Sequence, residues 1–342
     1  MSEIEMNGTV GLSVSTRAQQ MTSRLSPRPR TLLSDAWRRF RKHRMAMIGV
    51  IVLFTLALFS FVGPYVYVPR LAAELEAIGS PFIQDRVDLQ TAIDHLDFLN
   101  ILSAPSAIHP FGTDDLGRDL LARALYGGRV SLLVGLTAMA IAISLGTIIG
   151  ATAGFLGGVV DQILMRITDL FLSLPVIPLT LLVVYLFRDP VIQLMGSPEA
   201  GIFTIVVTVI GSLAWMSTAR IVRATFLSLK EKEFVEAAIA LGVSRPAIMF
   251  RHILPNAIGP IIVAATLEVG SAIITESTLS FLGVGFPPDT PTWGRLVTDG
   301  SQYLQAAPWL ALFPGALIFL TVLSINFVGD GLRDALDPRS RL

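Results

Sequence analysis

Long runs of residues without a charged side chain alternate with short polar segments along this chain. Residues 45–69 are 25 uncharged positions in a row, and a helix of about 20 residues crosses the hydrocarbon core of a bilayer. The further runs are 130–160, 170–187, 200–219, 300–329 and 257–286, the last interrupted only by Glu268 and Glu276. The pattern predicts an all-α polytopic membrane protein with six transmembrane helices.

For two of these runs we expect helix bounds that differ from the ends of the uncharged run. Run 130–160 is too long, so we expect its end at Gly157 and Gly158 to be a cytoplasmic turn before Asp161. Run 170–187 is marginal, so we expect its helix to begin earlier, near Leu164.

Small residues and prolines shape two of the predicted spans. The second span carries four glycines at successive i+4 positions: Gly146, Gly150, Gly154 and Gly158. This face has no side-chain bulk, so another helix can approach it closely. In the third span, Pro175 and Pro178 predict a kink, either in a pore-lining helix or as a plain structural bend.

The polar-punctuated segment from Glu233 to Asn256 lies between two apolar runs and is typical of two short helices joined by a bend. In its first helix four apolar residues at i, i+3, i+4 and i+7 form one stripe: Phe234, Ala237, Ala238 and Leu241. Val235 and Ile239 add apolar groups on the far side. The segment can therefore contact both its own membrane helices and a partner.

The bend is predicted at Gly242, because glycine tolerates the left-handed conformation that ends many helices. Ser244 can cap the second helix through its hydroxyl, and Pro246 falls in the first turn, where a missing N–H costs little. The second helix is expected to run towards Leu254 and Pro255. The alternative is an interfacial helix pair that only links two spans.

The distribution of Arg and Lys predicts the topology. The segments expected inside hold 19 of these residues and the segments expected outside hold 7. Cytoplasmic segments of membrane proteins carry an excess of positive charge. Both termini are therefore expected in the cytoplasm.

The first 44 residues contain a tail and a basic segment. Residues 1–30 have no helical or strand periodicity and are expected to be mobile. In the following segment, Trp37 and Phe40 lie among five cations: Arg38, Arg39, Arg41, Lys42 and Arg44. This segment is either a membrane-surface helix on anionic lipid or a charge cluster that holds the tail in the cytoplasm. Both interpretations place the N-terminus inside.

The segment 70–128, expected outside, is too long for a simple turn and is rich in carboxylates. Asp114, Asp115 and Asp119 near its end either hold a cation or belong to a capped helix start with an Asp/Arg network. We favour the network, because the spacing is not that of a calcium loop.

Two carboxylates, Glu268 and Glu276, lie within the fifth predicted span. Ionisable groups at membrane depth are costly and usually face protein or water. Glu268, Thr275 and Glu276 are therefore candidates for a translocation path, and the alternative for Glu268 is a buried hydrogen bond to a neighbouring helix. Glu276, nearer the outer end, is expected to be interfacial.

Composition excludes several kinds of site. The chain is 52% hydrophobic and 15% charged, has no net charge and contains no cysteine, so disulfides, thiolate metal sites and a basic nucleic-acid surface are not expected. The four histidines are scattered, which predicts no metal site. The three lysines follow Arg, Leu and Glu, so none lies in a P-loop. We expect no catalytic residues and no cofactor.

The segment 233–256 resembles the cytoplasmic coupling loop of ABC importer permeases, in which Glu-Ala-Ala, three residues, Gly and nine residues precede Ile-x-Leu-Pro. The matching residues are Glu236, Ala237, Ala238, Gly242, Leu254 and Pro255. His252 replaces the Ile, and Arg251 to Asn256 is similar to the form found in dipeptide, oligopeptide and nickel permeases. Two further stretches, HPFGTDDLGRD and SFLGVGF, also resemble that group.

The resemblance implies a type I ABC importer permease fold, with Arg251 and the matching residues in the ATPase-coupling loop. It implies a non-catalytic permease subunit of the bacterial inner membrane that transports small peptides or a related solute. The implied partners are a second, homologous permease, two cytoplasmic ATPases and a periplasmic solute-binding protein. An ion-coupled secondary transporter and a membrane enzyme are the alternatives, although no clear internal repeat favours the former.

The expected organisation follows from these observations. It comprises a cytoplasmic tail with the basic segment (1–44), a first transmembrane helix (45–69), a periplasmic segment (70–128), a five-helix core (129–332) with its coupling loop (230–256), and a cytoplasmic C-terminus (333–342).

Overall fold

The computed structural model describes residues 32–77 and 94–336, and the expected N-terminal tail lies outside them. The described residues form these helices in chain order: α2 (Leu32–Phe40), α3 (Arg44–Phe61), α4 (Gly63–Ala77), α6 (Leu120–Leu156), α7 (Gly158–Ser173), α8 (Val176–Met195), α9 (Pro198–Lys230), α10 (Glu233–Ala240), α11 (Arg245–Ala247), η1 (Ile248–Ile253), α12 (Leu254–Phe281), α13 (Trp293–Ser301) and α14 (Trp309–Leu336).

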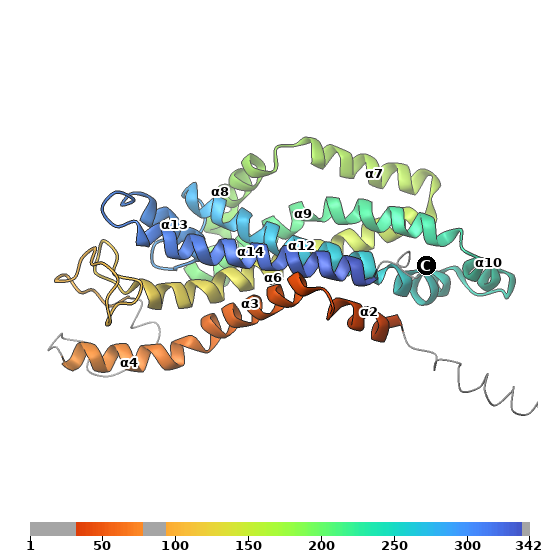
Figure 1. Ribbon diagram of the computed structural model, residues 1–342. Coiled ribbons are helices and arrows are strands. Elements are labelled where there is room, and N and C mark those ends of the chain that lie inside the picture. Colours follow the sequence, from red (N-terminus) through yellow and green to blue (C-terminus); the bar gives the residue numbers. More distant parts are fainter. Residues whose placement is uncertain (1–31, 78–93, 337–342) are drawn as a thin grey trace, which may run out of the picture.

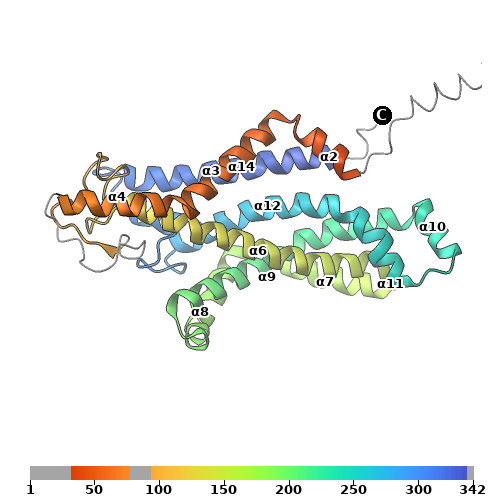
Figure 2. The same cartoon turned by 90° about the horizontal axis from the view of Figure 1, so that it is seen from below.

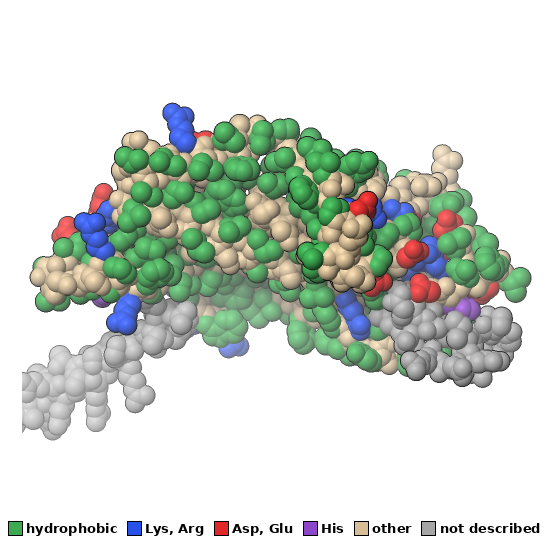
Figure 3. All heavy atoms as spheres, turned by 180° about the vertical axis from the view of Figure 1, so that it is seen from behind, with side chains coloured by type: hydrophobic (Ala, Val, Ile, Leu, Met, Phe, Trp, Pro, Cys, Tyr) green, Lys and Arg blue, Asp and Glu red, His purple; other side chains and the backbone are tan. Residues whose placement is uncertain are grey.

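Six helical segments of the described chain are long and apolar enough to cross a membrane, which confirms the predicted all-α fold with six spans. They are α3, α6, α8, α9, α14 and the continuous segment Arg245–Phe281. Figure 1 shows α10 at one end of the bundle, and the loop before α6 together with α13 at the other. In Figure 3, hydrophobic side chains cover most of the middle of the visible face, and charged ones gather mainly towards its ends.

The core of the bundle lies where α6, α9 and α12 meet. Val134 of α6, Val206 of α9 and Ala272 of α12 belong to one buried apolar cluster. The glycine face of α6 packs against α9, and a Cβ on Gly150 would collide with the carbonyl oxygen of Ala219. The close helix approach predicted from the glycine spacing is confirmed at Gly146, Gly150 and Gly154, whereas Gly158 lies beyond the end of α6 and a Cβ there would meet no atom within 4 Å.

The third span begins later in the sequence than expected. α6 ends at Leu156 and the turn at Gly157 and Gly158 is confirmed, since both have positive φ. The start near Leu164 is wrong, because α7 ends at Ser173 and the span-length helix α8 begins only at Val176. Leu174 is extended, because the ring of a following proline disfavours the helical conformation.

The uncharged run 45–69 is divided between two helices. α3 ends at Phe61, and α4 begins at Gly63 and continues to Ala77. Pro64 lies in the first turn of α4, where its missing N–H is tolerated. Figure 2 shows α4 extending along the bundle towards the end opposite α10.

Candidate functional site

The bend of the segment 233–256 lies at Gly242, as predicted. Its φ is 73°, in the left-handed region, and its N–H donates to the carbonyl of Ile239 at 2.9 Å. The N–H of Val243 donates to the carbonyl of Ala238 at 3.1 Å. A Cβ at position 242 would meet no atom within 4 Å, so backbone conformation rather than space favours glycine there.

The second helix of this segment differs from the prediction in two ways. Ser244 occupies the N-cap position, but its side chain makes no capping hydrogen bond. The helix also continues through the π-helix η1 into α12. Pro255 lacks the N–H that would bond the carbonyl of Arg251 in an α-helix, and the wider π turn before it avoids that requirement. Pro246 lies in the first turn, as expected.

We call residues 231–253 the hairpin. Its base is anchored in an apolar cluster. Val235 and Ala238 of α10 and Ile253 of η1 are buried with Val222 and Phe226 of α9. In addition, the ammonium of Lys230 donates to the carbonyl of Phe155 at 2.9 Å, at the end of α6. The hairpin is therefore held against α6 and α9.

The tip of the hairpin is apolar and uncovered. Leu241 is 83% exposed and Ile239 is 59% exposed, and Phe234 of α10 and Phe250 of η1 are also exposed. Of the four stripe residues, the fold buries only Ala238. Val235, assigned to the far side, is the residue that faces inward with it.

The structure brings most of the candidate coupling residues to the surface of one end of the molecule. Glu236, Ala237, Gly242, Arg251 and Pro255 are exposed. Ala238 is buried, and Leu254, which directly follows the hairpin, is half-buried and packs against the same apolar cluster.

The three candidate path residues do not form one cluster. Glu268 and Thr275 are half-buried and lie two turns apart on α12, with the exposed Ser271 between them. This edge of α12 carries a carboxylate and hydroxyls within a segment that is long and apolar enough to cross a membrane. The hydroxyl of Thr275 donates to the carbonyl of Ser271 at 2.9 Å, so it is satisfied within its own helix.

Glu276 is fully buried, so the expectation of an interfacial residue is wrong. Its Oε1 accepts hydrogen bonds from the hydroxyls of Ser280 and Thr292, each at 2.8 Å. Thr292 in turn caps α13 by accepting from the N–H of Arg295 at 3.0 Å. The carboxyl therefore joins α12 to the start of α13, a contact between residues 16 positions apart.

The loop before α6 contains the predicted Asp/Arg network. Asp119 caps α6 by accepting from the N–H of Ala122 at 2.7 Å. It also accepts from the hydroxyl of Tyr67 at 2.8 Å and lies 2.8 Å from Nδ1 of His109. Burial first, and then the nearby charge of Asp119, raises the pKa of the Tyr67 hydroxyl well above its usual range.

A second group of charges lies beside it. The carboxylate of Asp114 accepts from Nε of Arg118 at 2.7 Å and lies 3.7 Å from Nε of Arg123. Arg123 is completely buried, and its Nη2 donates to the carbonyl of Pro288 at 3.0 Å. Sequence reasoning missed the hydrogen bonds from Arg123 to Pro288 and from Tyr67 to Asp119, because the two residues of each pair lie in different segments.

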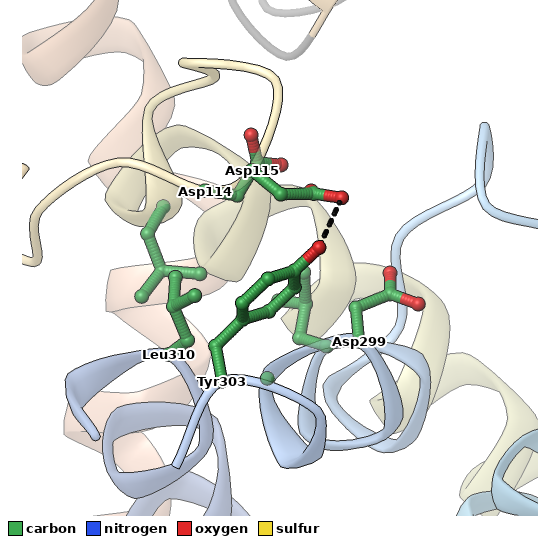
Figure 4. A pocket seen from close by; sticks show the side chains of 8 residues that line it. Asp114, Asp115, Asp299, Tyr303 and Leu310 are labelled. Atoms are coloured by element: carbon green, nitrogen blue, oxygen red, sulfur yellow. Dashed lines mark hydrogen bonds between the residues drawn. The ribbon is translucent and has the colours of Figure 1, made fainter. Parts of the chain in front are cut away.

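A small cavity lies between this loop and α13. Figure 4 shows Asp114, Asp115, Asp299, Tyr303 and Leu310 around it, with the Tyr303 hydroxyl donating to Asp115 at 3.2 Å. Its volume of about 10 Å³ is room for one water molecule. Burial raises the pKa of the Asp299 carboxyl. Among the described residues no group of three or more His, Cys, Asp or Glu side chains could hold a metal ion.

Two ion pairs connect α7 to α9. Arg223 donates to both oxygens of Asp161, with Nη2 to Oδ2 at 2.6 Å. Arg220 donates to Asp169 at 2.6 Å, and both of these side chains are about half exposed. The hydrogen bonds from Arg223 lower the pKa of the Asp161 carboxyl.

Comparison with known proteins identifies similar sequences over most of the chain. The family model described as "Binding-protein-dependent transport system inner membrane component" matches residues 146–342. The model described as "N-terminal TM domain of oligopeptide transport permease C" matches residues 31–85.

The alignments with individual relatives cover almost the whole length of both proteins. The oligopeptide transport system permease protein OppC of Haemophilus influenzae is 41% identical over 315 residues, which cover 91% of this chain and 90% of the relative. The Bacillus subtilis OppC is 38% identical, covering 93% of both chains. The dipeptide transport system permease DppC of Alkalihalophilus pseudofirmus is 38% identical, covering 90% of both. The MetNI methionine ABC transporter, solved in inward-facing conformations, matches with a TM-score of 0.48 at 20% identity, over 62% of this chain and 94% of that one.

Proposed function

This chain belongs to the family of binding-protein-dependent transport system inner membrane components, and we propose that it is a permease subunit of an ATP-driven peptide importer. It is a multi-pass protein of the inner membrane. The similar proteins are named oligopeptide and dipeptide permeases, which supports small peptides as the substrate. The ion-coupled alternative has no support among these relatives.

The observation that carries the proposal is the hairpin. It combines an anchored base at Val235, Ala238 and Ile253 with an uncovered apolar tip at Ile239 and Leu241. An apolar tip among exposed charged residues such as Glu236 and Arg251 fits a protein partner rather than the bilayer interior. A cytoplasmic ATPase subunit is that partner in our proposal.

ATP hydrolysis is assigned to separate chains. Each lysine of the sequence lacks the glycine-rich context of a P-loop. In our proposal, the energy of ATP hydrolysis therefore reaches this chain through its contact with an ATPase subunit. We propose two ATPase subunits, a second homologous permease and an external solute-binding protein as partners. The permease itself is then not an enzyme: it moves its spans when the hairpin moves.

The path for the solute is proposed along the polar edge of α12. Glu268, Ser271 and Thr275 are the polar groups of that edge, and they are partly accessible rather than buried in the bundle. Placing them against lipid would be costly. A water-filled path beside the second permease removes that cost. Glu276 is excluded from this path because it is fully buried.

The experiment is co-purification with the cognate ATPase. We expect the variant Phe234→Ser/Ile239→Ser/Leu241→Ser to be inserted normally and to lose the ATPase subunit, because the hairpin tip loses its apolar contacts. The control is Leu99→Ser, an exposed leucine in the loop at the opposite end, which should retain the ATPase. Undiminished retention in the triple variant would contradict the proposal.

A further inference from the structure

The short helix α2 is fixed against the end of α14. Phe40 is buried in a cluster with Ala46 and Ala335. A Cβ on Gly331 of α14 would lie 3.2 Å from the ring of Phe40. The ring nitrogen Nδ1 of His43 accepts from the N–H of Ala46 at 3.1 Å and caps α3. The orientation of α2 relative to α3 is thus set by packing, and Figures 1 and 2 both show α2 beside the end of α14.

The remaining surface of this junction is cationic. We define the basic patch as the exposed residues Trp37, Arg38, Arg41, Lys42 and Arg44. None of its four cations makes an ion pair within the described part of the chain. The acidic side chains described nearby are Asp330 and Asp334 of α14, and Asp334 lies 3.6 Å from His43. The patch therefore carries a net positive charge.

Trp37 distinguishes the patch from an ordinary solvated surface. It is 59% exposed, whereas Trp293 and Trp215 are buried and Trp309 is half-buried. An exposed tryptophan among cations next to a membrane span is typical of the interface, where the ring contacts acyl chains and the N–H remains hydrated.

The patch is continuous with an apolar stripe of α3. Met45, Ile48, Ile51 and Phe54 follow it at intervals of three residues, so the stripe winds about half-way round the helix, and all four residues are exposed. α3 is one of the six candidate spans, so this stripe faces lipid unless a protein covers it. The lipids that contact the stripe place their headgroups beside Arg41, Lys42 and Arg44.

From this juxtaposition we infer that the basic patch is a binding site for anionic phospholipid headgroups. Guanidinium groups donate to phosphate oxygens in paired geometry, and the ammonium of Lys42 adds a point charge. Near an anionic membrane surface each Lys or Arg contributes about a fivefold preference. The site would anchor the junction of α2, α3 and α14 to the inner leaflet, whatever solute the protein transports.

The test uses the full chain in nanodiscs that contain brominated phosphatidylglycerol or brominated phosphatidylcholine at equal mole fraction. The signal of Trp37 is the tryptophan quenching of the wild-type protein minus that of Trp37→Phe. We expect phosphatidylglycerol to quench this signal at least threefold more than phosphatidylcholine. The variant Arg38→Gln/Arg41→Gln/Lys42→Gln should remove the preference.

The matched control is Lys232→Gln/Arg245→Gln/Arg251→Gln, which removes three exposed cations of the hairpin end. It should leave the lipid preference unchanged. If the glutamine variant fails to insert, Arg38→Lys/Arg41→Lys keeps the charge and should keep most of the preference. Equal quenching by both lipids, or an equal loss in the control, would overturn the inference. If the variant Arg38→Gln/Arg41→Gln/Lys42→Gln keeps the lipid preference but loses the ATPase subunit, the patch would be a protein-docking surface. That result would also overturn the inference.

Discussion

The two ends of this molecule differ in how far their charged side chains are buried and paired. At the loop end, defined as residues 94–119 with α13, several charged side chains are buried and paired, as Asp114 and Arg118 are at 2.7 Å. At the hairpin end charged residues such as Glu236 and Arg251 are exposed, and apolar residues such as Leu241 are exposed with them.

This difference indicates what each end can do. A buried network loses several kcal/mol when one partner is removed, because a buried charge remains uncompensated. It therefore holds one arrangement and resists change. Both ends expose apolar residues, such as Leu99 of the loop and Leu241 of the hairpin, but the hairpin combines them with exposed charged residues and an anchored base, an arrangement that a partner protein can bind. Four substitutions test the comparison.

The largest effect is expected for Asp114→Asn. The substitution keeps the shape of the side chain but removes the charge that faces Arg118 and the fully buried Arg123. We expect a loss of about 3–5 kcal/mol, seen as a lower thermal unfolding temperature and a reduced yield of folded protein in detergent. Asp169→Asn is the control, because its pair with Arg220 is half exposed and should cost only about 0–1 kcal/mol. Equal losses in both variants would contradict the comparison.

The second effect is expected for Gly242→Val. A β-branched residue at a φ of 73° is strained by about 1–3 kcal/mol, while the spans are elsewhere and should insert. Retention of the ATPase and substrate-stimulated hydrolysis should fall at least severalfold in the purified complex. Gly196→Val is the control, since Gly196 has a φ of 70° and equally open space but ends α8. Loss of the ATPase in both variants would show that strain anywhere has this effect.

A smaller effect, confined to transport, is expected for Glu268→Gln. The side chain keeps its shape, so assembly should be normal, while peptide uptake falls a fewfold if the carboxylate faces the solute or water. Glu276→Gln offers the contrast, because Glu276 is fully buried between Ser280 and Thr292. It should alter stability at least as much as uptake. Normal uptake by the Glu268 variant would remove this residue from the path.

The smallest effect is expected for the pair of Asp161 and Arg223, which is only partly buried. Hydrogen bonds from Arg223 lower the pKa of Asp161 in the folded protein. Its stabilising contribution is therefore complete above the unfolded value of about 4, and is lost as the pH falls through the lower folded value. Asp161→Asn should lower the unfolding temperature by a few degrees at most at pH 7 and by less at pH 3. If the difference in unfolding temperature between the wild type and Asp161→Asn grew as the pH fell, the prediction would be contradicted.

Local features of this protein could be predicted from the sequence alone. The spans follow from uncharged runs long enough for a bilayer, and the turn at Gly157 and the bend at Gly242 follow from the conformational freedom of glycine. The capped start of α6 at Asp119 is local as well, because the side chain bonds an N–H three residues on. These properties depend on neighbouring residues, so they are present in the sequence pattern.

Tertiary structure decided which residues are paired and which are left uncovered. Val235 rather than Phe234 faces inward because α9 offers Val222 and Phe226 on that side. One partner of Glu276 is Thr292, which lies across a loop and caps another helix. Arg123 meets Asp114 only after the loop folds back over α6. A single sequence contains no distances between such segments, and burial and partnership depend on those distances.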